Sequence, residues 1–203
     1  MKENPVIYLA SRSPRRRALL NQIGISHALL EIDIDEQQRP DEEPIAYVLR
    51  LAREKAEAGA GLVAGGESLP VLAADTSVVI ENRVLGKPMD RDHGLWMLKQ
   101  LSGRTHQVYT AVALDWWGIE MELSHSEVSF RVLSEAEMAA YWATGEPADK
   151  AGGYAIQGVG ARFIGMLHGS YSGVMGLPLF ETAELLSRNG IQFDNENKSV
   201  IDV

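Results

Sequence analysis

The sequence predicts an α/β fold, in which helices pack against a shared sheet. Short apolar segments of strand length alternate with helical segments in the first half of the chain, and two long segments that alternate apolar and polar residues follow. The chain has 203 residues, which is enough for one sizeable core or for two lobes that share one sheet.

The first expected elements are a strand at about residues 6–10 and a helix from Pro14 to about Gln22. Ser13 stands where an N-cap belongs, and Pro14 takes the first helical position, where its missing N–H costs nothing. Gly24 is a suitable place for the helix to stop. The free amides and the positive dipole end of this helix start therefore point outward.

Four arginines lie within six positions at this helix start: Arg12, Arg15, Arg16 and Arg17. Such a helix start attracts phosphate, and the alternative interpretation is a solvated basic turn. Two observations favour phosphate binding. The chain carries a formal net charge of −9, so a cationic cluster is unusual for it. On a helical wheel, Arg16 also shares its stripe with Leu19 and Leu20, so we expect it to face inward.

A second strand is expected at about residues 28–32, and an acidic stretch follows it, with Asp33, Asp35, Glu36, Asp41, Glu42 and Glu43. We expect most of these carboxylates to be solvated, while one or two face a cleft and hold a metal. Pro44 begins a helix, and Lys55 falls on its apolar stripe with Val48 and Leu51. Such a lysine either extends to the edge of the core or enters a site at the C-terminal end of the helix. A loop is then predicted by Gly59, Gly61, Gly65, Gly66 and Pro70.

An apolar strand opens at Val71, and we expect the polar residues 75–77 to interrupt it before Val78 resumes it. Burying an ionised carboxylate is costly without a partner, a metal or a cleft. Asp75 is therefore either a strand-end residue that caps a neighbouring amide, or a catalytic or metal-binding carboxylate. After a turn, the sequence Gly-Lys-Pro gives Lys87 a rigid mount beside this aspartate.

The second half of the chain predicts a long hairpin between two helices. We expect Asp90 to cap a helix that runs to about Leu101. Strands follow at about 105–114 and 121–132, and a Ser134–Glu137 capping box then opens a helix that ends near Thr144. Trp116 and Trp117 join the two strands. We interpret them as a packing or oligomer contact rather than a base-stacking platform, because nothing basic accompanies them.

Residues 146–160 are rich in glycine but lack the spacing of a P-loop. Four of the nine residues 152–160 are glycine, which suggests a backbone that wraps around something. Gln157 offers an amide donor and an acceptor, which is what reading the edge of a base requires. A strand at about 162–167 and a last helix ending near residues 189–190 follow, and residues 194–203 are expected to be a frayed tail.

Composition limits the classes of function. Hydrophobic residues make up 45% of the chain and charged residues 23%, as in ordinary globular proteins, and no apolar run is long enough for a membrane span. The chain has no cysteine, so it has no disulfide, thiolate catalysis or Cys-based zinc site, and we expect a cytoplasmic enzyme. The acidic balance argues against nucleic-acid binding. The five histidines lack metal-ligand spacing, and we interpret them as structural or surface residues.

The arginines at the first helix start, Lys55, Lys87, Asp75 and Gln157 form a consistent set. Together they suit metal-assisted hydrolysis of a nucleotide phosphoanhydride.

Six motifs resemble those of the Maf family of nucleoside triphosphate pyrophosphatases. They are residues 10–16 (ASRSPRR), 74–76 (ADT), 86–88 (GKP), 101–106 (LSGRTH), 149–158 (DKAGGYAIQG) and 169–171 with 176–179 (GSY and GLPL). One of these motifs alone is a weak signal. All six occur in the order of the family, and together they cover nearly the whole chain.

The resemblance implies a long, curved mixed sheet with two lobes around a central cleft, related to the inosine-triphosphate pyrophosphatases, with residues 1–193 as one domain. It implies cleavage between the α and β phosphates of a nucleoside triphosphate, with Mg²⁺ or Mn²⁺ as cofactor, by a protein that forms a homodimer. By position, Asp75 is the proton acceptor and shares metal binding with Glu36. The positions associated with phosphate are Ser11, Ser13, Arg15, Arg16, Lys55 and Lys87, and those associated with base specificity are Arg15, Thr76 and Gln157.

The loop around Gln157 resembles the branch of the family that acts on dTTP and UTP. Thymine and uracil present an N3–H donor between two carbonyl acceptors, which suits a glutamine amide, and a wrong base leaves polar groups unpaired. Arg12 departs from the family, which often has a small residue there, and it either contacts phosphate or points to solvent. The alternatives are the same reaction on 7-methyl-GTP or another modified nucleotide, and a non-enzymatic nucleotide-binding regulator of cell division.

Overall fold

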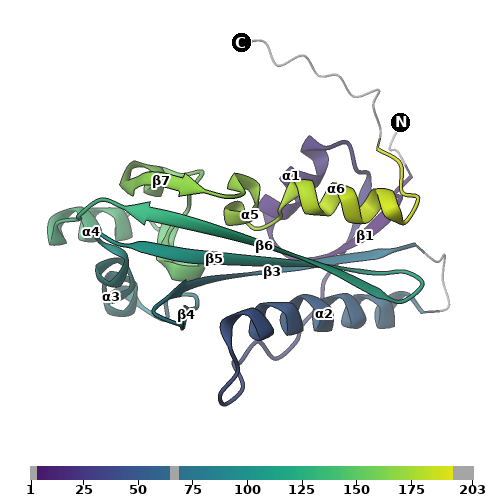
Figure 1. Cartoon of the computed structure of the whole chain (residues 1–203), viewed down its shortest axis with the longest axis horizontal. Helices are drawn as coiled ribbons and strands as arrows, with labels where there is room; N and C mark the ends of the chain where they lie inside the picture. The colour runs from purple at the N-terminus through teal and green to yellow at the C-terminus, as the bar shows by residue number, and fades with distance from the viewer. Residues whose placement is uncertain (1–3, 65–68, 194–203) are drawn as a thin grey trace, which may run out of the picture.

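A computed structural model describes residues 4–64 and 69–193 (Figure 1). Within these residues, seven strands form one sheet: β1 (Ile7–Ala10), β2 (His27–Leu30), β3 (Val71–Ile80), β4 (Arg83–Leu85), β5 (Thr105–Asp115), β6 (Ile119–Phe130) and β7 (Ile164–His168). The α-helices are α1 (Pro14–Gln22), α2 (Pro44–Val63), α3 (Arg91–Leu101), α4 (Glu135–Trp142), α5 (Tyr171–Met175) and α6 (Leu179–Arg188). Three short 3₁₀ turns are η1 (Glu146–Asp149), η2 (Ala151–Gly153) and η3 (Val159–Phe163).

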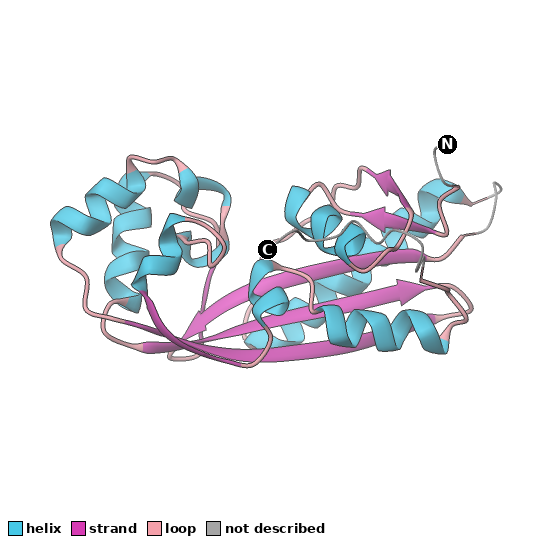
Figure 2. Cartoon of the chain, turned by 90° about the horizontal axis from the view of Figure 1, so that it is seen from above, coloured by secondary structure: helices cyan, strands magenta, loops and turns pink. Residues whose placement is uncertain are grey.

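The sheet is mixed, which confirms the predicted α/β class. Strand β1 pairs in parallel with β2 and β3, whereas β3, β5, β6 and β7 pair successively antiparallel. Strand β4 pairs antiparallel with the C-terminal end of β3, at residues 78–80. The long strands β3, β5 and β6 run along the molecule, and the helices gather in two groups toward its two ends (Figure 2).

Both faces of the sheet are covered at the end that holds β1 and β2, with α2 on one face and α1 and α6 on the other (Figure 1). Strand β3 therefore buries alternate residues on opposite faces, with Leu72 packed in the α1–α6 cluster and Val71 in the α2 cluster. A third apolar cluster at the other end joins α3 and α4 to β5 and β6, and includes Leu98, Val108 and Tyr141. Among residues 4–64 and 69–193, no helix is long and apolar enough to cross a membrane.

The helix boundaries follow the local signals in the sequence. Helix α1 spans the predicted residues, and Ser13 takes the N-cap position, although its side chain makes no capping bond. The Asp90 carboxylate accepts a hydrogen bond from the His93 amide at 2.8 Å, and Ser134 and Glu137 form the predicted capping box. Strands β5 and β6 form the expected hairpin, with Trp116 and Trp117 in its turn.

Strand β3 is continuous, so the expected interruption at residues 75–77 is wrong. Asp75 pairs with Ala111 of β5 in the middle of an unbroken antiparallel register, and it is not a strand-end residue. The polar side chains fit within the strand because neighbouring elements supply partners for them. Lys55 donates to Asp75, and the Thr76 hydroxyl lies 3.1 Å from that of Thr110.

The loop expected to begin at Gly59 is also wrong, because Gly59 and Gly61 both lie within α2. A Cβ on Gly59 would be 2.7 Å from Cγ1 of Val71 and 3.0 Å from Cβ of Ala10. Glycine is therefore needed where the helix approaches β1 and β3, not where it ends. Gly65, Gly66 and the tail from Asp194 lie outside the described residues.

Candidate active site

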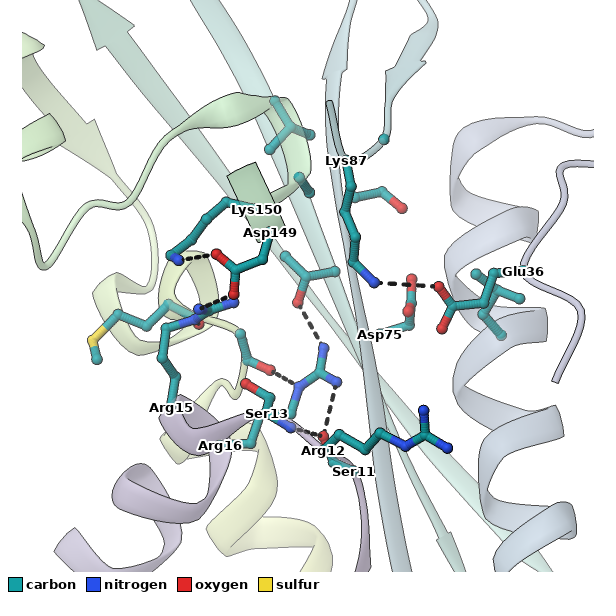
Figure 3. Close-up of a pocket in the computed structure, with 18 of the residues that line it drawn as sticks. Ser11, Arg12, Ser13, Arg15, Arg16, Glu36, Asp75, Lys87, Asp149 and Lys150 are labelled. Carbon is teal, nitrogen blue, oxygen red and sulfur yellow. Dashed lines mark hydrogen bonds and ion pairs between the residues drawn. The ribbon is translucent and has the colours of Figure 1, made fainter. Parts of the chain in front are cut away.

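A cavity of about 760 Å³ is lined by residues from both ends of the molecule. Its walls come from the start of α1, the coil between β2 and α2, the helix α2, the middle of β3, the segment after β4, the Gly-rich segment and the end of α5. Every site residue predicted from the sequence lines it: Ser11, Ser13, Arg15, Arg16, Glu36, Lys55, Asp75, Thr76, Lys87 and Gln157. The fold thus brings together residues that lie far apart in the sequence, and several are seen in Figure 3.

Lys55 lies between two carboxylates of this cavity. Its ammonium nitrogen is 2.7 Å from Oδ1 of Asp75 and 2.7 Å from Oε1 of Glu36. Lys55 and Asp75 are each only 7% exposed. Of the two interpretations of Lys55, the structure supports entry into a site, but from the middle of α2 rather than from its C-terminal end.

Glu36 also faces Lys87, whose nitrogen lies 3.7 Å from its Oε2 (Figure 3). Burial raises the pKa of Glu36, but the hydrogen bond from Lys55 and the charges of Lys55, Lys87 and Arg16 outweigh burial and hold that pKa below its ordinary value. Glu36 is therefore an anion that reaches the cavity from the coil between β2 and α2.

Arg16 points inward, as its place on the apolar stripe of α1 predicts. Its Nε donates to the Gly176 carbonyl oxygen at 2.7 Å, and its other nitrogens donate to the hydroxyls of Ser11 at 3.4 Å and Thr76 at 3.3 Å. Burial lowers the pKa of Arg16, while the nearby Asp75 opposes this shift. The guanidinium is thus held in a fixed orientation beside the catalytic candidate Asp75 (Figure 3).

Arg15 links the start of α1 to the Gly-rich segment. Its Nε donates to the Met175 carbonyl oxygen at 3.3 Å, and its Nη1 lies 3.9 Å from Oδ2 of Asp149. Lys150 pairs with the same Asp149 carboxylate (Figure 3). Arg12, by contrast, is exposed at the cavity wall.

Lys150 and Tyr47 are among the lining residues that the sequence interpretation left out of the site. Lys150 adds a further cation, and it stands within a motif that was noted only for its glutamine and glycines. Tyr47 donates its hydroxyl to the Glu36 carbonyl oxygen at 2.8 Å. Burial, with the charges of Asp75 and Glu36, raises the pKa of Tyr47 to about 12. The signal for Tyr47 was its spacing, since it precedes Lys55 by two helical turns on the same face of α2.

The donor set fits a divalent cation that is shared with a phosphate ligand. Asp75 and Glu36 offer carboxylate oxygens, and Mg²⁺ is usually held by one or two carboxylates together with substrate phosphates and water. Within the described residues, no group of three or more His, Cys, Asp or Glu side chains could hold a metal ion by itself. Asp75 and Glu36 are therefore carboxylates that would suit a cation shared with a phosphate ligand.

Comparison with known proteins places the chain in a family. Residues 6–189 match the model of the family described as Maf-like protein. A dTTP/UTP pyrophosphatase of Alkalilimnicola ehrlichii is 55% identical over 192 residues, which cover 93% of this chain and 95% of that protein. A dTTP/UTP pyrophosphatase of Saccharophagus degradans is 58% identical over 182 residues, which cover 89% of this chain and 87% of that protein.

Solved structures give a more distant likeness. A nucleoside-triphosphatase (dITP/XTP pyrophosphatase) of Mycobacterium abscessus has 19% sequence identity and a TM-score of 0.44, over 91% of this chain and 93% of that one. The family match does not depend on this likeness, because it covers most of the chain by sequence. The chain belongs to the family of Maf-like proteins.

Proposed function

We propose that this chain is a nucleoside triphosphate pyrophosphatase that hydrolyses dTTP and UTP to the monophosphate and pyrophosphate. The observation that carries the proposal is the convergence of one buried aspartate, several cations and a glutamine on a single cavity. The names of relatives that are more than half identical over most of the chain support the choice of nucleotide.

In the proposed reaction, Asp75 accepts a proton from the attacking water. The water oxygen forms a bond to the α-phosphorus, the bond from that phosphorus to the oxygen that bridges to the β-phosphorus breaks, and pyrophosphate leaves. Lys55 stands within hydrogen-bond distance of Asp75 and orients its carboxylate. Arg15, Arg16 and Lys87, with the hydroxyls of Ser11 and Ser13, bind the phosphates.

We further propose that Asp75 and Glu36 hold Mg²⁺ or Mn²⁺ together with the phosphates of the substrate. When bound, the cation neutralises phosphate charge. Thr76, Arg15 and Gln157 line the same cavity, and in the proposal all three contact the base, with the Gln157 amide paired to its edge. Gln157 is exposed at the cavity, so its amide is available to a ligand.

The proposal is tested by pyrophosphate release from dTTP, UTP, CTP, GTP, ITP and 7-methyl-GTP with Mg²⁺ or Mn²⁺. We expect turnover of dTTP and UTP, because the glutamine amide matches the edges of thymine and uracil. Asp75→Asn should lower kcat by roughly 10²- to 10⁴-fold, the usual contribution of a general base. Gln157→Ala should weaken or broaden base selectivity.

Other outcomes separate the alternatives. Turnover of 7-methyl-GTP in place of dTTP would keep the reaction but refute the substrate class. Nucleotide binding without any turnover would favour a regulator, and in that case Asp75→Asn should leave the cellular effect intact.

We also propose that residues 1–193 form one domain with two lobes, and that the protein acts as a homodimer in the cytoplasm. The hairpin turn between β5 and β6 is our candidate contact, because Trp117 is 84% exposed. Light scattering of the wild type and of Trp117→Ser tests the dimer, since loss of the contact should lower the mass to that of one chain.

A further inference from the structure

Glu146 lies outside the cavity, yet three hydrogen-bond donors converge on its carboxylate. The Tyr141 hydroxyl and the Gly160 amide donate to Oε1 at 2.6 and 3.0 Å, and the Val159 amide donates to Oε2 at 2.8 Å. The Tyr141 hydroxyl in turn accepts from the Ala155 amide at 3.1 Å. These bonds fix the backbone on both sides of Gln157.

Two of the four glycines of this segment, Gly158 and Gly160, are explained by the same two side chains. A Cβ on Gly158 would be 2.2 Å from Oε2 of Glu146, and a Cβ on Gly160 would be 2.6 Å from the Tyr141 hydroxyl. The glycines of this segment suggested a backbone that wraps around something. At these two positions, the backbone wraps around side chains of the same chain.

A carboxylate is well matched to this position. Glutamate presents two acceptor oxygens, whereas glutamine presents one acceptor and an amino group that would face an N–H. Burial raises the pKa of Glu146, but the hydrogen bonds from Tyr141, Gly160 and Val159 hold it below its ordinary value. Glu146 is therefore ionised at neutral pH. Tyr141 is fully buried, so its hydroxyl is fixed by α4.

We infer that Glu146 and Tyr141 are positioning residues for base selection, because they hold the segment that presents Gln157. This inference rests on the proposed function, in which Gln157 pairs with the base. Tyr154, Ala155 and Gln157 line the cavity, whereas Tyr141 and Glu146 do not. The pair therefore acts through the loop and not by touching the nucleotide.

The first test needs no activity. Hydrogen exchange of the amides of Ala155, Val159 and Gly160 is measured in the wild type and in Glu146→Gln and Tyr141→Phe. We expect faster exchange at Val159 and Gly160 in the first variant and at Ala155 in the second. The control is Glu137→Gln, because Glu137 also accepts from a backbone amide, that of Ser134 at 3.0 Å, while its other side-chain hydrogen bonds are to Arg131 and to the Ser134 hydroxyl rather than to the loop. Exchange that is unchanged in Glu146→Gln, or equally raised in the control, would overturn the inference.

The second test separates a positioning role from a merely structural one. In Glu146→Gln, KM for dTTP should rise about tenfold, the equivalent of one good polar contact. The preference for dTTP over CTP should fall by a similar factor, whereas kcat should change less than about threefold because the phosphate site is untouched. In a Gln157→Ala background, Glu146→Gln should cause no further loss of preference.

An equal loss of preference with and without Gln157 would overturn the inference, since Glu146 would then act by another route. The proposed function has its own failure, namely a wild type that hydrolyses neither dTTP nor UTP. In that event the nucleotide that the wild type does hydrolyse replaces dTTP in the comparison, and the exchange experiment stands unchanged.

Discussion

At the residue scale, Lys55 and its two carboxylates show how buried charge is accommodated in this molecule. Lys55 and Asp75 are both nearly inaccessible, and each charge would be costly to bury alone. The ion pairs that Lys55 forms with Asp75 and with Glu36, each at 2.7 Å, compensate that cost. Lys87 belongs to the same cavity but its side chain is 65% exposed, so water already solvates it.

This contrast predicts different costs for removing the two lysines. Lys55→Met keeps the length of the side chain but leaves Asp75 buried without its cation, and it should lower the free energy of unfolding by about 3 kcal/mol. Lys87→Met should change that free energy by less than about 1 kcal/mol. Urea unfolding without nucleotide measures both values. Equal losses for the two variants would mean that Asp75 is solvated and needs no partner.

At the scale of elements, local signals in the sequence predicted the structure well, and signals that depend on distant partners did not. The start of α1 and the caps of α3 and α4 depend on residues within one turn, so Ser13, Asp90 and Ser134 located them. The unbroken β3 and the full length of α2 depend on tertiary contacts. Asp75 stays within a strand because Lys55 reaches it from α2, and Gly59 stays within a helix because β1 and β3 pack against it.

The candidate site follows the same division. Its motif residues could be found from the sequence because six motifs resemble those of the family, and because the chemistry of phosphate and base recognition restricts the residue types at several of these positions. Their arrangement could not be predicted, because Lys55 serving two carboxylates and Asp149 joining Arg15 to Lys150 depend on how the elements pack. Glu146 gave no signal, because two of its three donors are backbone amides, which any residue can supply, and the third, Tyr141, reaches it only through the packing of α4.

The two glycines within α2 make a matched pair for testing this packing. Both should gain about 1 kcal/mol of helix propensity when replaced by alanine. Gly61 has no atom within 4 Å of an added Cβ, so Gly61→Ala should stabilise the protein. In Gly59→Ala the added Cβ meets Val71 and Ala10, and overpacking of about 1–3 kcal/mol should make this variant less stable than the wild type. Thermal unfolding compares the two, and stabilisation by both would show that α2 can move away from the sheet.

At the scale of the whole molecule, the sheet connects the two groups of helices that form the cavity. Arg16 and Lys55 come from helices packed at the end that holds β1, whereas Lys87 and Lys150 come from segments near the opposite end of β3. The Gly152 amide donates to the Gly86 carbonyl oxygen at 3.0 Å, and so joins the Gly-rich segment to the Lys87 segment. The geometry of the site therefore depends on the folding of both ends together.

The stability of that whole fold should depend on pH through His106, one of the histidines interpreted as structural. It is 2% exposed, its Nε2 lies 2.8 Å from the Tyr154 hydroxyl, and its ring packs edge-on against Phe130. Burial lowers the pKa of His106 to about 3, from its ordinary value of 6.5. Between these values the unfolded chain binds a proton that the folded chain does not, so stability is full above pH 6.5 and falls as the pH decreases.

From pH 7 to pH 5, this single histidine should lower the free energy of unfolding by about 2 kcal/mol, since the unfolded form is protonated and the folded form is not. His106→Gln removes the titrating group and can keep a hydrogen bond to Tyr154, so its unfolding free energy should fall about 2 kcal/mol less over the same interval. Urea unfolding at the two pH values measures this difference between the proteins, and the remaining titrating groups cancel because both proteins contain them. An NMR titration of the folded wild type gives an independent check, because the His106 ring should stay neutral from pH 7 to pH 5. Two results would contradict this prediction: a His106 ring that gains a proton near pH 6, or an equal pH dependence in the two proteins. Either would show that water reaches His106, and that the core around β5, β6 and the Gly-rich segment opens more readily than its packing indicates.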